Sequence, residues 1–252
     1  MYEFHLFAGI GGGILGGMLA GNIPVGAVEL AEYPRKLLVK RQMDGILPFF
    51  PVWDDVCTFR ADNPECGWFV EYLRGIRDDL QICGGFPCTD ISPVGKKAGI
   101  EGAESSLWRE MARIVGEIRP RSVFVENSAD LVIRGLDRVL ADLTLLGYDC
   151  RWGVMGGHHL GKTRRKRLWL LGQSKSDGLV SVQVYAGAEF ANDLRRNTKI
   201  VHGGVSADIR RIPVAGFPGV DNGLSDEMVG AIRGCGMAQI PPVAGIMETV
   251  LR

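Results

Sequence analysis

Hydrophobic positions along the chain follow two patterns, short apolar runs and longer stretches with helical spacing. The apolar runs predict strands near residues 3–8, 25–29, 49–53, 79–83, 121–125, 149–155 and 167–172. The intervening stretches predict helices, and in 106–118 one face gathers apolar side chains. Its members are Leu107, Met111, Ile114, Val115 and Ile118. Repeated strand–helix units predict an α/β fold with a mostly parallel sheet and helices on both faces, and the short gap before the last strand predicts a hairpin at the sheet edge.

A glycine-rich turn follows the first predicted strand and precedes an apolar helix. Gly9, Gly11, Gly12 and Gly13 lie in this turn, where missing side chains let a ligand approach the backbone and the helix N-terminus favours an anionic group. The spacing departs from the Gly-x-Gly-x-x-Gly of dinucleotide folds. Glu29, about 20 residues on, ends the second predicted strand, where an acidic residue binds ribose hydroxyls. A solvated surface charge is the alternative, and the combination with the turn favours a nucleoside ligand.

A cysteine follows the predicted strand at 79–83. Gly84-Gly85-Phe86-Pro87-Cys88 holds a thiol between a fixed proline and a glycine-rich loop that contains Lys96 and Lys97. The carboxyl ends of strands are where ligands bind in open α/β sheets, and such a loop can close over an anionic substrate. Most free cysteines are instead small buried hydrophobic residues, which is the alternative here.

Charged residues accompany three further strands. Asp55 follows the strand at 49–53 and either accepts the amino group of an adenine or caps a turn. Glu126, with Asn127, ends the strand at 121–125, where burial would raise the pKa of the carboxyl group and suit it to general acid catalysis. Arg165 and Arg167 open the last strand, and alternation sends both side chains to the same side.

The order of these segments resembles that of the DNA (cytosine-5) methyltransferases. Phe7-Ala8-Gly9-Ile10-Gly11-Gly12 is similar to their S-adenosylmethionine loop and Gly85-Phe86-Pro87-Cys88 to their nucleophile motif. Glu126-Asn127 resembles their acid motif and Arg165-x-Arg167 their paired-arginine motif. Ser106-Leu107-Trp108 and Gly234-Cys235-Gly236-Met237 resemble two cofactor-contacting segments. The resemblance covers residues 1–173 and about 225–252.

The resemblance implies roles for individual residues. Catalysis would fall to Cys88 as nucleophile, Glu126 as acid, and Arg165 and Arg167. Contacts to S-adenosylmethionine would come from Phe7, Gly9, Gly11, Gly12, Glu29, Leu30, Asp55, Val56, Gly85, Pro87, Leu107, Gly236 and Met237. Substrate contacts would come from Ser92, Lys96, Lys97, Asn127, Arg195 and Arg196. The implied fold is the Rossmann-like fold of S-adenosylmethionine-dependent methyltransferases, acting on a flipped-out cytosine.

Three positions depart from the family pattern. Cys235 stands where the closing motif has asparagine, Ser128 where the acid motif continues with valine, and Thr163 where the arginine motif has glutamine or histidine. These changes affect cofactor contacts more than the reaction, because Cys88 and Glu126 are present.

Composition limits the remaining possibilities. The chain is 46% hydrophobic with a formal net charge of zero, so any basic footprint for nucleic acid must be local. No apolar run is long enough to cross a bilayer, and a strand and glycine turn occupy the place of a signal peptide. Six cysteines show no zinc-finger spacing. We expect a cytoplasmic monomer without metal or disulfide.

Residues 174–224 interrupt the alternation of strands and helices and form a candidate target-recognition region, with 1–173 and 225–252 as the catalytic domain. The expected partner is double-stranded DNA, with a cognate restriction enzyme as a further one. The alternatives are a tRNA cytosine-5 methyltransferase, a non-catalytic DNA-binding relative, a nicotinamide dehydrogenase and an enzyme that methylates free cytidylate. The dehydrogenase hypothesis assigns no role to Cys88 or Glu126.

Overall fold

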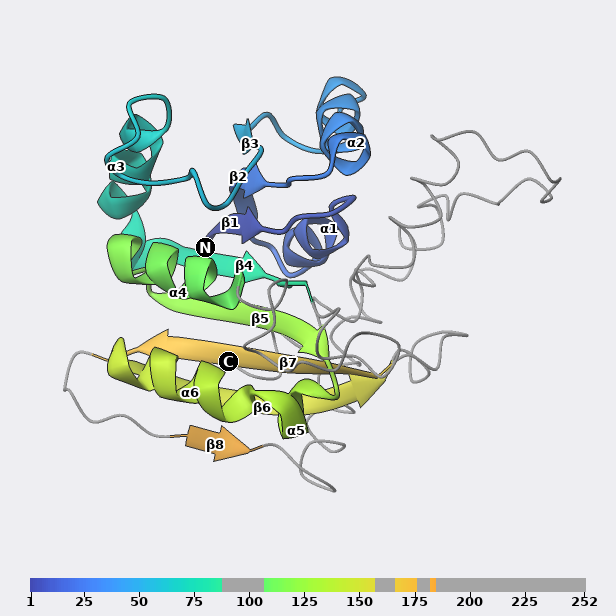
Figure 1. The fold of residues 1–252 in the computed structure, drawn as a ribbon. Coiled ribbons are helices and arrows are strands. Elements are labelled where there is room, and N and C mark those ends of the chain that lie inside the picture. Colours follow the sequence, from blue (N-terminus) through green and yellow to red (C-terminus); the bar gives the residue numbers. More distant parts are fainter. Residues whose placement is uncertain (88–106, 157–165, 176–181, 185–252) are drawn as a thin grey trace, which may run out of the picture.

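The computed structural model describes residues 1–87, 107–156, 166–175 and 182–184. In these ranges one sheet has the strand order β3-β2-β1-β4-β5-β7-β6-β8 (Figure 1). The strands are β1 (Tyr2–Leu6), β2 (Ile23–Val28), β3 (Val52–Trp53), β4 (Leu80–Gly84), β5 (Ser122–Ser128), β6 (Tyr148–Gly156), β7 (Lys166–Ser174) and β8 (Val182–Val184). The helices are α1 (Gly12–Leu19), α2 (Glu32–Met43), α3 (Gly67–Gly75), α4 (Leu107–Ile118), α5 (Leu131–Arg134) and α6 (Leu136–Leu145), with a short 3-10 turn at Arg77–Asp79.

Strand directions confirm the predicted α/β class. Strands β3, β2, β1, β4 and β5 pair in parallel, whereas β7 runs antiparallel to both β5 and β6. The antiparallel pairing of β6 with β7 was predicted, but its place at the sheet edge was wrong. Strand β8, which lies within the predicted target-recognition region, pairs in parallel with the outer side of β6.

Two predicted strands are shorter in the structure for local reasons. The first ends at Leu6 because Phe7 adopts a φ of 54°, which bends the backbone out of the strand. The third shrinks from 49–53 to Val52–Trp53. Pro51 has no N–H to donate, and only its carbonyl takes part in the ladder, accepting a bond from Ala27 N at 3.0 Å. The side chain of Phe49 is consequently exposed.

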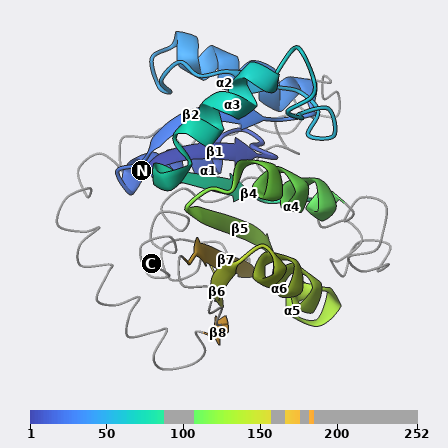
Figure 2. The same cartoon turned by 90° about the vertical axis from the view of Figure 1, so that its left-hand side faces the viewer.

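Helices cover the two faces of the sheet unequally. The main hydrophobic core includes buried side chains of α3, α4 and α6, and α4 and α6 lie side by side over one face (Figures 1 and 2). A smaller cluster joins Ile14 of α1 and Leu38 of α2 to Ala27 of β2. None of the helices in the described ranges combines the length and apolarity needed to cross a membrane.

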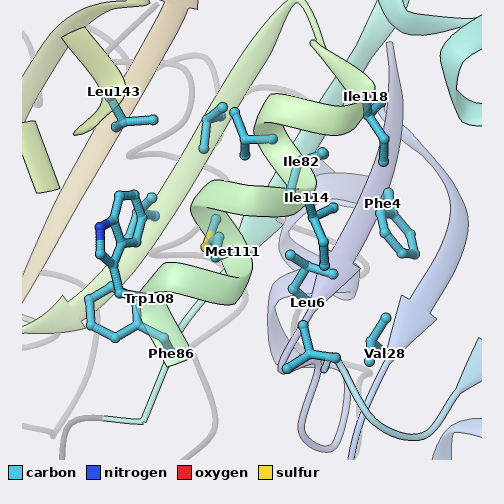
Figure 3. Packing of buried hydrophobic residues seen from close by; sticks show 14 of the residues in the cluster. Phe4, Leu6, Val28, Ile82, Phe86, Trp108, Met111, Ile114, Ile118 and Leu143 are labelled. Carbon is cyan, nitrogen blue, oxygen red and sulfur yellow. The ribbon is translucent and has the colours of Figure 1, made fainter. Parts of the chain in front are cut away.

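Helix α4 shows how sequence spacing produces the core. The apolar face predicted from its spacing is buried at Met111, Ile114 and Ile118 (Figure 3), whose exposed fractions are at most 1%. Val115 of the same face is also fully buried. Trp108, which was absent from the predicted face, is also buried, and its indole N–H donates to Asp142 of α6 at 2.9 Å. Leu107 is only half-buried. The first turn of α4 therefore faces both the core and the edge where ligands are expected.

Polar side chains occupy the opposite face of β1 and β4, beneath α1. Glu3 is 1% exposed and accepts hydrogen bonds from Asn22 at 2.8 Å and Gln81 at 3.2 Å. Helix α1 approaches so closely here that a Cβ added at Gly17 would lie 1.8 Å from the Glu3 carboxylate. Glycine at position 17 is thus what admits a buried carboxylate beneath this helix.

Replacing Gly17 with alanine should destabilise the protein by about 1–3 kcal/mol, because overpacking at this contact forces the helix or the carboxylate to move. Gly75→Ala is the matched control, since a Cβ there meets nothing within 4 Å. Urea denaturation of both variants measures the difference. Equal stability of Gly17→Ala and wild type would show that the contact is not tight in solution.

Candidate active site

The loop after β1 has a backbone shape that glycine allows. Gly9 and Gly11 have φ angles of 54° and 86°, and Gly11 caps α1. The guanidinium of Arg41 donates to the carbonyl of Ile10, which ties the loop to α2. A Cβ at Gly11 would lie 2.9 Å from Leu38. The loop is therefore held by backbone conformation and by contacts from α2, which leaves its other side open to a ligand.

Glu29 holds the same loop from the end of β2. Its Oε2 accepts a hydrogen bond from Gly9 N at 2.6 Å, and its Oε1 accepts one from Ala31 N at 2.9 Å. Arg35 donates to the backbone carbonyls of Glu29 and Leu30 at 3.0 Å and 2.7 Å. Glu29 is thus more than a solvated surface charge. Each of its oxygens keeps a further lone pair that can accept a bond from a ligand hydroxyl.

Asp55 takes part in a turn after β3. Its Oδ1 accepts a hydrogen bond from Cys57 N at 2.9 Å, and its carbonyl accepts one from the Thr58 hydroxyl at 2.9 Å. Both of the alternatives considered for Asp55 are compatible with this geometry, because the carboxylate shapes the turn and also borders the cavity described below. Partial burial, followed by the nearby Asp55 charge, raises the pKa of the Cys57 thiol. Cys57 is therefore a poor nucleophile at neutral pH.

The loop after β4 is held by contacts of Phe86 with β5 and α4. Phe86 is 2% exposed and its ring centroid lies 5.5 Å from that of Trp108 (Figure 3). The carbonyl of Phe86 accepts a hydrogen bond from Asn127 Nδ2 at 3.1 Å. Asn127, predicted as a substrate contact, is itself almost fully buried. Its amide thus connects β5 to the segment that leads to Cys88.

Glu126 and Arg167 form an ion pair across two strands. Strands β5 and β7 are antiparallel, with Ser128 opposite Arg167 and Glu126 opposite Trp169. This register places Arg167 Nε 2.5 Å from Glu126 Oε1, with both side chains mostly buried. Burial favours the neutral carboxylic acid, whereas an adjacent cation favours the carboxylate. The protonation of Glu126 therefore depends on the Arg167 cation as well as on the burial expected from the sequence.

One cavity of about 370 Å³ brings these elements together. Its walls come from the loop after β1, the ends of β2, β4 and β5, the first turns of α2 and α4, the turn after β3, and β7. The lining residues are Phe7, Gly9, Val28, Glu29, Leu30, Pro34, Asp54, Asp55, Val56, Cys57, Gly85, Phe86, Pro87, Leu107, Glu126, Asn127, Ser128 and Arg167. Most of the predicted site residues in the described ranges are among them. Gly11 and Gly12 are not, since they form the junction between loop and helix.

Sequence reasoning assigned no site role to six of the lining residues, Val28, Pro34, Asp54, Cys57, Phe86 and Ser128. Pro34 had a usable signal, because a proline shortly after Glu29 marks the first turn of a helix whose N-terminus faces the same edge. Nine predicted residues lie outside the described ranges. They are Cys88, Ser92, Lys96, Lys97, Arg165, Arg195, Arg196, Gly236 and Met237.

Comparison with known proteins identifies the family of this chain. A family model described as C-5 cytosine-specific DNA methylase matches residues 1–203. The Type II methyltransferase M.CviJI of Paramecium bursaria Chlorella virus IL3A is 35% identical over 162 residues, which cover 62% of this chain and 39% of that protein. The Type II methyltransferase M.Eco47II of Escherichia coli is 35% identical over 148 residues, covering 57% and 32%. The chain thus spans about a third to two fifths of the length of these relatives.

Solved structures share the fold. A DNA modification methyltransferase encoded within an E. coli prophage superposes with a TM-score of 0.52 at 23% identity, covering 71% of this chain and 48% of that one. The Dnmt2 methyltransferase of S. pombe superposes with a TM-score of 0.54 at 15% identity, covering 80% and 55%.

Proposed function

Because the chain belongs to the C-5 cytosine-specific DNA methylase family, we propose that it transfers a methyl group from S-adenosylmethionine to carbon 5 of a flipped-out cytosine in DNA. One observation carries the proposal. A single cavity joins Glu29 and the glycine loop to the Glu126–Arg167 pair, and Pro87 on its wall directly precedes Cys88. A cofactor and a base bound there would therefore meet beside the nucleophile.

The cavity suits S-adenosylmethionine in size and chemistry. Its volume falls within the range of about 300–1,000 Å³ typical of small-ligand sites. Glu29 would accept the ribose hydroxyls, Asp55 the adenine amino group, and Leu30, Val56 and Leu107 would contact the rings. Gly9, Gly85 and Pro87 would pack against the cofactor, while Phe7, Gly11 and Gly12 would shape the loop. Gly236 and Met237 would close the site. When bound, S-adenosylmethionine supplies a methyl group on a positively charged sulfur.

Covalent catalysis follows from the residue types. Carbon 5 of cytosine is a weak nucleophile, so the Cys88 thiolate attacks carbon 6 while Glu126 donates a proton to ring nitrogen 3. The resulting enamine is electron-rich at carbon 5, where it would accept the methyl group that S-adenosylmethionine supplies, with the neutral thioether S-adenosylhomocysteine as the leaving group. Loss of the carbon 5 proton to a water molecule, departure of the Cys88 thiolate and return of the nitrogen 3 proton to Glu126 would restore the aromatic ring.

Arg167 has two tasks in this mechanism. Its guanidinium holds the Glu126 carboxyl group at the cavity wall through the 2.5 Å contact, and its other N–H groups, one of which donates to the Lys166 carbonyl at 3.2 Å, would bind the carbonyl oxygen of the base. Arg165 would contact a flanking phosphate. Because a cytosine inside a duplex cannot enter such a cavity, the base must first leave the helix.

DNA recognition is proposed from the sequence. Ser92, Lys96 and Lys97 would grip the backbone near the vacated position, and Arg195 and Arg196 would read bases from the target-recognition region at 174–224. The rest of the chain, 1–173 and 225–252, would form the catalytic domain. The relatives named as Type II methyltransferases support a role beside a cognate restriction enzyme that cuts the same sequence.

Glu29→Ala should weaken S-adenosylmethionine binding by about 1–3 kcal/mol, the cost of leaving hydrogen-bond partners unpaired. The substitution also removes the hydrogen bond that holds Gly9 N. Glu32→Ala is the matched control, because Glu32 only pairs with Lys36 on the exposed surface of α2. Isothermal calorimetry of both variants measures the affinities. Unchanged affinity in Glu29→Ala, or tight binding of a nicotinamide dinucleotide in place of S-adenosylmethionine, would refute the cofactor assignment.

The substrate is tested by offering labelled S-adenosylmethionine with double-stranded DNA, tRNA and free cytidylate in parallel. We expect label in DNA and none in the other two. If only tRNA or only cytidylate became labelled, that molecule and not DNA would be the substrate, and the cofactor assignment would still hold.

A further inference from the structure

Three residues with metal-binding side chains meet beneath the cofactor loop. Glu3 and His5 point to the same face of β1, and Cys83 lies opposite His5 on the neighbouring strand β4. One ligand atom from each, a carboxylate oxygen, an imidazole nitrogen and the sulfur, all lie within 4.8 Å of one another. We call these residues the Glu3–His5–Cys83 cluster. All three side chains are buried, with exposures of 1%, 5% and 6%.

We propose that the Glu3–His5–Cys83 cluster is a binding site for one zinc ion. Thiolate, imidazole and carboxylate are the three side-chain ligands that zinc takes in proteins, whereas a thiolate disfavours magnesium and calcium. His5 Nε2 and Glu3 Oε2 lie 3.0 Å apart. Two ligand atoms of a tetrahedral zinc ion with bonds of about 2.0–2.1 Å are about 3.3 Å apart, so a small adjustment suffices.

Neighbouring residues form hydrogen bonds to the Glu3 carboxylate that resemble those made to metal ligands by residues outside the first coordination sphere. Glu3 Oε1 accepts hydrogen bonds from Asn22 and Gln81, which leaves Oε2 directed toward His5. The Gln81 Oε1 in turn accepts a bond from the Ser122 hydroxyl at 3.0 Å. Such outer hydrogen bonds fix the orientation of metal-binding carboxylates. Gly17 provides the space that the Glu3 carboxylate needs.

A fourth ligand has room beside the cluster. A cavity of about 40 Å³ is bordered by His5 and Cys83 and also by Gly9, Gly13 and Glu126. A water molecule needs about 10–15 Å³, so one can occupy the open position of a tetrahedral ion. The zinc site would thus lie between the glycine loop and the Glu126 carboxyl group, and would link the two strands that carry the cofactor loop and the nucleophile loop.

Charge supports a divalent cation at this place. A zinc ion bound by one carboxylate, one thiolate and a neutral imidazole is electrically balanced, which favours its burial beneath α1. Binding would release the Cys83 thiol proton to solvent, and His5 would bind the ion through an unprotonated Nε2. The zinc site does not depend on the proposed methyl transfer, because its ligands are different residues.

Metal content tests the site directly. The untagged full chain is equilibrated with excess zinc chloride, desalted and analysed by inductively coupled plasma mass spectrometry. We expect one zinc ion per chain in wild type, in Cys66→Ser and in Cys88→Ser, and almost none in Cys83→Ser or His5→Ala. Cys66 is the matched control, a buried thiol that contacts the carbonyls of Thr58 and Arg60. No zinc in wild type, full zinc in Cys83→Ser, or loss of zinc in Cys88→Ser would overturn the proposal.

Cobalt substitution keeps the test informative if the variants do not fold. Cobalt(II) added to the metal-free wild-type chain should produce a thiolate-to-cobalt charge-transfer band and the visible absorption of a four-coordinate ion. Addition of zinc should remove both signals and raise the melting temperature. Absence of the thiolate band in the folded wild-type chain would contradict the assignment of Cys83 as a ligand.

Discussion

Cys88→Ser is expected to abolish methyl transfer while leaving the affinity for S-adenosylmethionine nearly unchanged. A serine hydroxyl is far less ionised than a thiol at neutral pH, so it cannot attack carbon 6 of the base. Wild type should form a covalent complex with DNA containing 5-fluorocytosine, because fluorine at carbon 5 blocks the elimination that releases the enzyme. Denaturing electrophoresis detects this complex, which the variant should not form.

Two other cysteines provide controls for the nucleophile. Cys150→Ser and Cys66→Ser should retain methyl transfer after correction for the folded fraction, since both thiols are buried away from the cavity. Burial raises the pKa of the Cys150 thiol to about 12, so almost none of it is thiolate at neutral pH. Near-normal turnover by Cys88→Ser, or loss of the covalent complex in either control, would exclude the mechanism.

Glu126→Gln is expected to lower the rate of methyl transfer by a factor of about 10²–10⁴, the usual contribution of a positioned general acid. Glutamine keeps the shape of the side chain but cannot protonate ring nitrogen 3, and it also removes the charge that pairs with Arg167. The rate is measured in single-turnover experiments with saturating cofactor. Asp137→Asn, an exposed carboxylate on α6, is the control and should be unaffected.

The pH profile separates the acid from a merely structural role. If Glu126 donates the proton, the wild-type rate should fall as the pH rises through an ionisation that is absent in Glu126→Gln, whereas the ionisation of the Cys88 thiol should affect both proteins. Arg167→Lys should retain folding but lower the rate, because lysine cannot reproduce the guanidinium geometry. An unchanged pH profile and a rate within about twofold of wild type in Glu126→Gln would remove this residue from the chemistry.

The general architecture could be predicted from hydrophobic spacing alone, because strands and helices alternate and α4 has a regular apolar face. Features that depend on pairing between distant strands could not. Glu126 and Arg167 were both identified, yet their ion pair follows from the antiparallel register of β5 and β7, which local pattern does not set. The position of β8 outside β6 has the same origin.

Residues with two tasks were also difficult to predict. Glu29 was identified as a ligand-binding carboxylate, but its hydrogen bond to Gly9 N became visible only once β1 and β2 were placed side by side. Glu3, His5 and Cys83 have no characteristic metal-binding spacing, because they come together through the parallel pairing of β1 with β4. Polar residues within a strand otherwise indicate only an exposed face, and here that face is covered by α1.

The proposed reaction is tested most directly by identifying the modified nucleoside. Wild-type protein is incubated with double-stranded DNA and S-adenosylmethionine bearing an isotopically labelled methyl group, and the DNA is then digested and analysed by mass spectrometry. The proposed function predicts that the label is in 5-methyl-2′-deoxycytidine and that Cys88→Ser produces none. Label in a methylated adenine or in the exocyclic amino group of cytosine, or unlabelled DNA from a folded chain that binds the cofactor, would contradict it.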